Sequence, residues 1–61
     1  MTGNAKVKFN LINGAKKVFA FQVKGKGVDH IENKVSEFAE IQRYKYGNQI
    51  KMLVWEVQFI E

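Results

Sequence analysis

Few residues in this chain of 61 could carry out nucleophilic or acid–base catalysis: it has one His, one Ser, one Asp and no Cys. His30 and Ser36 lie six positions apart in a segment with helical spacing, so they point about 240° apart around the axis. Asp29 is better explained as a helix cap, and Glu37 and Glu40 as part of a solvated helix surface. We therefore predict that the protein is not an enzyme and has no small-molecule substrate.

Metal and nucleotide sites are also not indicated. Without Cys and with His30 as the single His, a Cys/His zinc site is excluded. Gly25, Lys26 and Gly27 precede a predicted helix, where free backbone N–H groups attract phosphate, but they match no phosphate-loop motif. A flexible strand-to-helix connection is favoured over a nucleotide site. We predict no cofactor and no metal.

Lysine placement is the most specific chemical signal. No acidic residue precedes Asp29, whereas residues 29–61 hold four basic and six acidic side chains. A positively charged first half favours contacts with the phosphates of nucleic acid. An ordinary solubility surface is the alternative interpretation. The predicted nucleic-acid contacts are Lys6, Lys8, Lys16, Lys17, Lys24 and Lys26.

The lysines lie in a predicted β-hairpin. Alternating apolar residues indicate strands at about residues 5–12 and 18–24, and Asn13-Gly14 is a strong hairpin signal. A two-residue turn would put the Phe side chains on opposite faces, so we favour an odd-length loop over residues 13–17, or a bulge at Gly14.

That loop sets the predicted register. It pairs Leu11 with Phe19, Phe9 with Phe21 and Val7 with Val23. On the other face it places Lys6 opposite Lys24 and Lys8 opposite Gln22. Like charges directly opposite each other cost stability, and a bound anion would offset that cost. The register therefore supports the nucleic-acid interpretation.

A helix and a third strand follow. Asp29 as N-cap with Glu32 three residues later resembles a capping box, and Gly47 is typical of a helix end, so we place the helix at about 29–46. Its apolar positions are Ile31, Val35, Phe38, Ala39 and Ile41. Residues 50–60 have the β-branched and aromatic content of a strand.

The order β-β-α-β predicts an α+β fold, a single domain over residues 1–61. A right-handed crossover places the third strand beside the first, which gives a three-stranded antiparallel sheet of order 2-1-3 with one helix on one face, a two-layer sandwich.

The aromatic side chains limit the kind of binding. Periodicity places Phe9, Phe19, Phe21, Trp55 and Phe59 toward the helix, as core. Tyr44 and Tyr46 remain as candidates for base stacking, although Tyr44 projects from the solvent side of the helix. Binding is expected to depend on charge and shape more than on base identity.

Self-association is predicted because so short a chain buries a thin core and has no disulfides. The third strand is the longest, and its outer edge is unpaired in the order 2-1-3. Ile50, Met52 and Val54 are expected on the face opposite the helix, where nothing covers them. These three residues are the predicted homodimer interface.

Two functions are compatible with these features. The first is a small basic DNA- or RNA-binding protein that contacts phosphates through a lysine-rich β-hairpin. The alternative is a protein-interaction or inhibitor module, of the virus- or plasmid-type regulator kind, that binds a partner through the third strand. No signal peptide or membrane segment is indicated, so we expect a cytoplasmic, regulatory protein.

Overall fold

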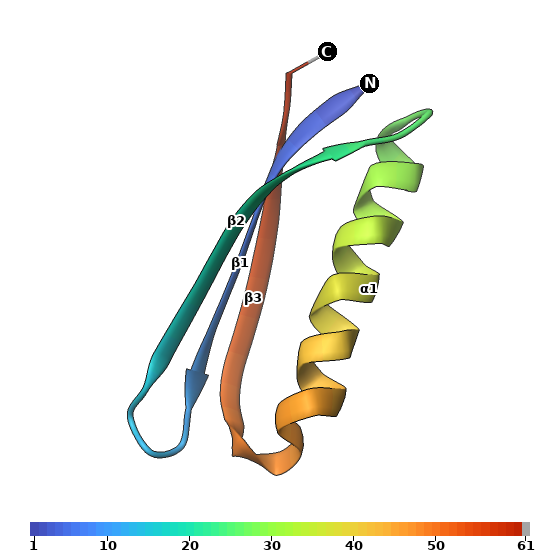
Figure 1. Ribbon diagram of the computed structural model, residues 1–61. Coiled ribbons are helices and arrows are strands. Elements are labelled where there is room, and N and C mark those ends of the chain that lie inside the picture. Colours follow the sequence, from blue (N-terminus) through green and yellow to red (C-terminus); the bar gives the residue numbers. More distant parts are fainter. Residues whose placement is uncertain (61) are drawn as a thin grey trace.

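The sheet and the helix form two layers (Figure 1). The computed structural model describes residues 1–60; Glu61, the last residue of the predicted domain, lies outside the described residues. The elements are β1 (Thr2–Leu11), β2 (Lys16–Lys24), α1 (Val28–Tyr46), a 3-10 turn (Gly47–Gln49) and β3 (Ile50–Phe59).

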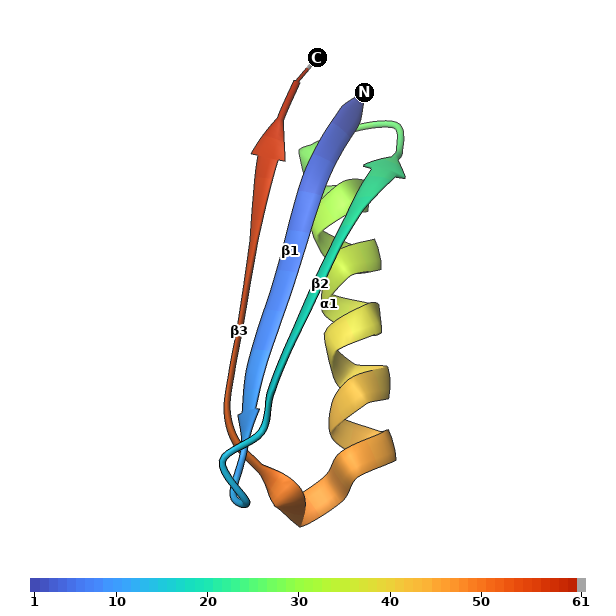
Figure 2. The same cartoon turned by 60° about the vertical axis from the view of Figure 1, so that its left-hand side comes forward.

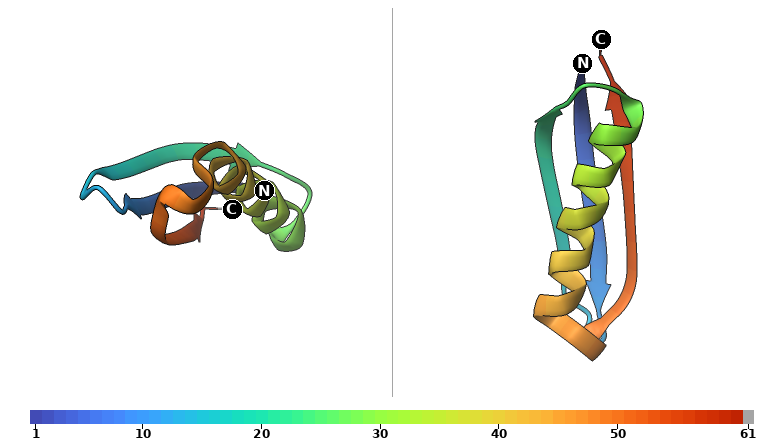
Figure 3. Two further views of the ribbon diagram at one scale, coloured as in Figure 1. Left: turned by 90° about the horizontal axis from the view of Figure 1, so that it is seen from below. Right: turned by 90° about the vertical axis from the view of Figure 1, so that its right-hand side faces the viewer.

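The predicted topology is confirmed. The three strands are antiparallel in the order β2-β1-β3. The helix covers one face of the sheet, running obliquely across it, and nothing covers the other face (Figures 2 and 3). Among residues 1–60, no helix has both the length and the apolar character needed to cross a membrane.

The hairpin loop is shorter than predicted. The N–H of Gly14 donates to the carbonyl of Leu11 at 3.0 Å, and the N–H of Leu11 donates to the carbonyl of Ala15 at 2.8 Å. Gly14 has a φ of 92°, which completes the pattern of a three-residue loop with a glycine bulge. The side chain of Asn13 also accepts the N–H of Ala15. The odd loop length and the bulge were predicted correctly, but the five-residue loop was wrong.

The shorter loop changes the register. Phe9 lies opposite Lys17 and Val7 opposite Phe19, so β2 is displaced by four residues along β1 from the predicted pairing. An even displacement keeps every side chain on its predicted face, because side chains alternate with a period of two. The faces were therefore correct although the partners were not.

The core lies between β1 and α1. Odd-numbered β1 side chains from Ala5 to Leu11 are buried against the helix, together with Ile31, Val35 and Ala39. Gly3 continues this row, where a Cβ would lie 2.8 Å from a methyl group of Val57. The helix was predicted with Ile41 in its apolar face, but Ile41 is 59% exposed and Gln42 is buried instead.

The helix begins differently from the predicted capping box. Its N-cap is Gly27, which has no side chain to bond the free N–H groups, and Asp29 lies in the first turn. His30 Nδ1 accepts the N–H of Lys26 at 3.0 Å, which fixes the connection from β2. A Cβ at Gly25 would lie 3.0 Å from the same ring nitrogen, so a larger residue there would have to push the His30 ring aside.

Candidate nucleic-acid interface

The uncovered side of the sheet, which we call the open face, carries the even-numbered side chains of all three strands. Odd-numbered β1 residues face the helix, and the register carries that alternation across the sheet. The open face consists of Thr2, Asn4, Lys6, Lys8 and Asn10 from β1; Lys16, Val18, Ala20, Gln22 and Lys24 from β2; and Met52, Val54, Glu56 and Gln58 from β3, with Ile60 directly after it.

Four of the six predicted contact lysines lie on the open face: Lys6, Lys8, Lys16 and Lys24. The other two lie elsewhere. Lys17 is opposite Phe9, on the side of the sheet that faces the helix, and Lys26 is in the connection between β2 and α1. The structure therefore brings part of the predicted set together on one surface.

The predicted pairs of opposed residues are wrong. Lys6 lies between Ala20 and Glu56, and Lys8 lies between Val18 and Val54. The cause is the displaced register, which puts Lys24 opposite Thr2. No lysine on the open face is directly opposite another, so the strain expected from opposed like charges is absent. The positive charge is spread along the face instead.

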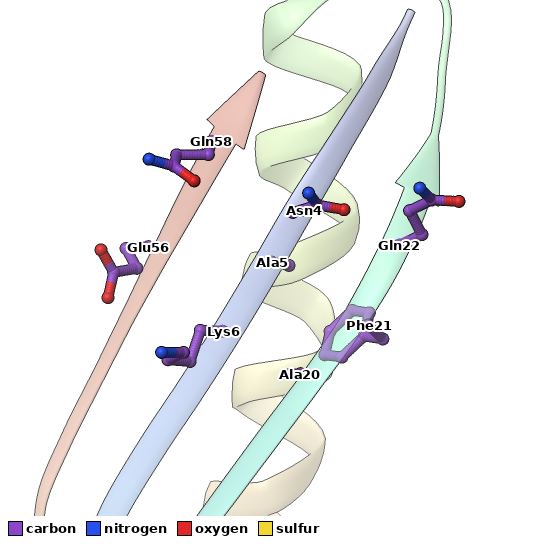
Figure 4. A pocket seen from close by; sticks show the side chains of 8 residues that line it. All are labelled: Asn4, Ala5, Lys6, Ala20, Phe21, Gln22, Glu56 and Gln58. Carbon is purple, nitrogen blue, oxygen red and sulfur yellow. The ribbon is translucent and has the colours of Figure 1, made fainter. Parts of the chain in front are cut away.

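Two hollows mark the open face. The larger, about 560 Å³, is lined by polar side chains of all three strands, among them Asn4, Gln22 and Gln58, which form one row across the sheet (Figure 4). The smaller, about 270 Å³, is also lined by residues of all three strands, among them Lys8, Lys16 and Val54. Both hollows are shallow depressions of a surface rather than enclosed cavities.

The amide row was not among the site residues predicted from the sequence. Its signal was available, since Asn4 shares the parity of Lys6 and Lys8, Gln22 that of Lys24, and Gln58 that of Met52 and Val54. Which amides meet in one row depends on the register, which was predicted incorrectly. Amide side chains can donate and accept hydrogen bonds at base edges as well as at phosphates.

The open face holds no aromatic side chain. The Phe and Trp residues of the strands share the helix side, as predicted. Tyr44 is 92% exposed on α1, as expected. Tyr46, the other candidate for base stacking, instead packs on Phe9 with ring centroids 5.3 Å apart and is partly buried. Stacking of bases on this sheet is therefore not supported.

The predicted dimer residues do not share one surface. Met52 and Val54 are on the open face, 57% and 47% exposed. The prediction that Ile50 lies on the face opposite the helix was wrong. The register of β3 shifts next to Leu11, so Ile50 pairs with that residue and packs against the core. The extra residue at the shift is Lys51, and one inserted residue reverses the side on which Ile50 points.

Catalytic and metal chemistry gain no support from the geometry. Within the described residues 1–60, no three His, Cys, Asp or Glu side chains are close enough to hold a metal ion. His30 is exposed and bonded to the backbone of Lys26. Comparison of the chain with protein-family models, with curated proteins and with solved structures gives no match.

Proposed function

We propose that the protein is a non-enzymatic nucleic-acid-binding protein that uses the open face of its sheet. One observation carries the proposal: four lysines share an uncovered sheet face that has a single carboxylate, Glu56. The net charge of +4 is consistent with it.

The contacts would be mainly with phosphates. Lysine ammonium groups bind phosphate as point charges, and such contacts make affinity strongly dependent on salt. The amide row adds groups that hydrogen-bond either the backbone or base edges. Because the open face has no aromatic ring, the sheet differs from single-strand binders that stack bases on their strands.

The test is a mobility-shift titration with single- and double-stranded DNA and RNA at several salt concentrations. For the variant with Lys6, Lys8 and Lys24 replaced by Gln, we expect weaker binding. The slope of log affinity against log salt should fall by about three, one unit for each lost phosphate contact. Circular dichroism should show an unchanged fold, because all three side chains are exposed.

Lys34 keeps its charge in the control, because its Nζ donates to the carbonyl of Lys24 at 2.7 Å. The control replaces two other basic residues of the helix by Gln, Arg43 and Lys45. These residues are exposed and belong to α1, on the other side of the sheet. The control should keep the parent slope. Equal losses per removed charge in the two variants would mean that only net charge matters, and unaltered binding in the first would contradict the proposal.

A second candidate is a protein-interaction module that uses β3. Its outer edge has no partner strand, and Met52, Val54, Trp55 and Phe59 are each more than a third exposed. A partner bound there would be held by apolar contacts and backbone hydrogen bonds, so its binding should persist at high salt. The homodimer expected from the sequence would use this same edge.

A further inference from the structure

The free backbone groups of β3 belong to its odd-numbered residues. The N–H of Ile60 donates to the carbonyl of Thr2 at 2.9 Å, so even-numbered β3 residues direct their backbone groups to β1. In an antiparallel ladder the direction alternates. Leu53, Trp55, Val57 and Phe59 therefore present N–H and C=O groups to the outside of the sheet.

The outer edge of β2 is the other free edge, and lysines protect it. Lys16 and Lys24 lie at its two ends, and the Nζ of Lys34 donates to the carbonyl of Lys24 at 2.7 Å. If two β2 edges paired antiparallel over their full length, Lys16 would lie opposite Lys24 of the other copy. Lysines at an edge are a common protection against such pairing.

The edge of β3 lacks this protection. Between Met52 and Ile60 its single charged residue is Glu56, and the chain contains no Pro. Along this stretch the exposed apolar side chains are Met52, Val54 and Ile60 on the open face, and Trp55 and Phe59 on the helix side. A long, apolar and unpaired edge is the surface to which a further strand adds.

We propose that two copies of the chain join through β3, antiparallel, with the two-fold axis at Val57. The result is one six-stranded sheet of order β2-β1-β3-β3-β1-β2 with both helices on the same side. Three pairs of outward-facing residues would exchange about six backbone hydrogen bonds. This inference does not depend on nucleic-acid binding.

Side-chain matching selects this axis. With Val57 opposite itself, Trp55 lies opposite Phe59 of the partner copy on the helix side. On the open face, Val54 lies opposite Ile60 and Glu56 opposite Gln58, so apolar groups meet apolar groups and a carboxylate meets an amide. Both exposed aromatic side chains of β3 then gain a neighbour.

The neighbouring registers match less well. Paired residues of the two copies must point to the same face of the sheet. The two-fold axis can therefore lie only at a residue position, and the alternatives are axes at neighbouring residues. An axis at Glu56 would place the two carboxylates directly opposite each other. An axis at Trp55 would place Val54 opposite Glu56 and Met52 opposite Gln58, which leaves apolar groups against polar ones.

The decisive experiment changes the charge at Gln58, an exposed position on the open face. Gln58→Glu places two carboxylate pairs across the interface, and Gln58→Lys places two Lys–Glu pairs there. Without nucleic acid, in low salt, we expect the dimer dissociation constant from analytical ultracentrifugation to rise about fivefold for Glu and to fall about fivefold for Lys. Repulsion between chains of net charge +4 alone would give the opposite order.

The matched control is Gln22, which lies in the same row of the sheet but on β2. Gln22→Glu and Gln22→Lys make the same charge changes away from the proposed interface and should not reproduce the order seen at Gln58. A parent protein that stays monomeric at millimolar concentration would overturn the proposal. A dimer that responds alike to the changes at Gln58 and Gln22 would overturn it as well.

Discussion

At the scale of single residues, the ring of Phe38 holds α1 against β2. It packs edge-on to Phe19 with centroids 5.4 Å apart, and it lies 4.8 Å from the ring of Phe21. Phe19 in turn stacks on the buried Phe9 at 6.0 Å. A partly buried residue thus connects the helix to the core through a chain of aromatic contacts.

We expect Phe38→Ala to destabilise the fold by about 3 kcal/mol, the lower end of the usual range for Phe, because the side chain is only partly buried. A domain of this size has little more stability in reserve. Urea denaturation followed by circular dichroism measures the change. Ile41→Ala on the same helix is the control; its side chain is 59% exposed, so it should change stability by less than about 0.5 kcal/mol. Similar losses for the two variants would contradict this account.

The position of a lysine in its strand, and not its charge alone, decides whether it reaches the open face. Lys6 and Lys8 reach the open face because β1 alternates, and this could be predicted from the sequence. Lys17 has the same charge but the other parity, so the strand directs it away from that face. The number of lysines shows that the first half of the chain is basic. Whether each lysine of a strand has an even or an odd number decides whether it lies on the open face.

At the scale of elements, the hairpin loop fixes the register of β2. Gly14 has a φ of 92°, and nothing lies within 4 Å of where its Cβ would be. Space is therefore available there, and the restriction on this position is conformational. Any other L-residue would strain the loop that sets which β2 residue faces which β1 residue.

A synthetic chain tests this restriction directly. Gly14→Ala should destabilise the protein by about 1–2 kcal/mol in thermal unfolding, because L-alanine disfavours positive φ. D-alanine at the same position prefers positive φ and should restore or exceed the parent stability, since it also restricts the unfolded chain. Equal effects of the two enantiomers would show that the loop does not need a positive φ.

The start of α1 shows how local signals compete. Asp29 and Glu32 have the spacing expected around a helix start, but the helix begins one residue earlier, with Gly27 as its N-cap. No side chain bonds the free N–H groups of the first turn, and His30 instead accepts the N–H of Lys26, which lies before the helix. Sequence patterns located the helix to within one residue at this end, and the packing of the connection decided the cap.

At the scale of the whole molecule, the open face is uncovered and both sheet edges are unpaired, but lysines protect only the β2 edge. The open face and the β3 edge therefore remain as the two surfaces available for binding. They share Met52, Val54, Glu56 and Gln58, so a second copy at the edge would extend the open face rather than block it. In the proposed six-stranded sheet, the two β1 strands lie about 14 Å apart, with two β3 strands between them. The dimer would thus present two groups of lysines on one continuous surface.

Hydrogen exchange gives an independent measurement of this assembly. We expect the amides of Trp55, Val57 and Phe59 to exchange more slowly as the protein concentration rises, because dimer formation pairs their outward N–H groups. The outward amides of β2, such as those of Val18 and Ala20, should not respond. NMR exchange at two concentrations distinguishes the edges, and a uniform response of both would contradict pairing through β3.

The sequence by itself determined the elements, their order and the face on which the strand residues lie, with Ile50 as the exception. These properties depend on local periodicity: a period of two in the strands separates Phe9 and Phe21 from Lys6 and Lys8 whatever their partners are. The topology followed because a right-handed crossover leaves one arrangement for the third strand.

Only the tertiary structure decided which residues are neighbours. The turn at Gly14 displaces β2 along β1, so Lys24 does not lie opposite Lys6. The irregularity at Lys51 shifts the register of β3 by one residue, so Ile50 packs against the core. The alternation of side chains along one strand reveals neither change. The amide row and the free backbone groups of β3 follow from that pairing. Strand partners are set by loop geometry and by contacts between distant segments, so they are fixed only when the whole sheet closes on its helix.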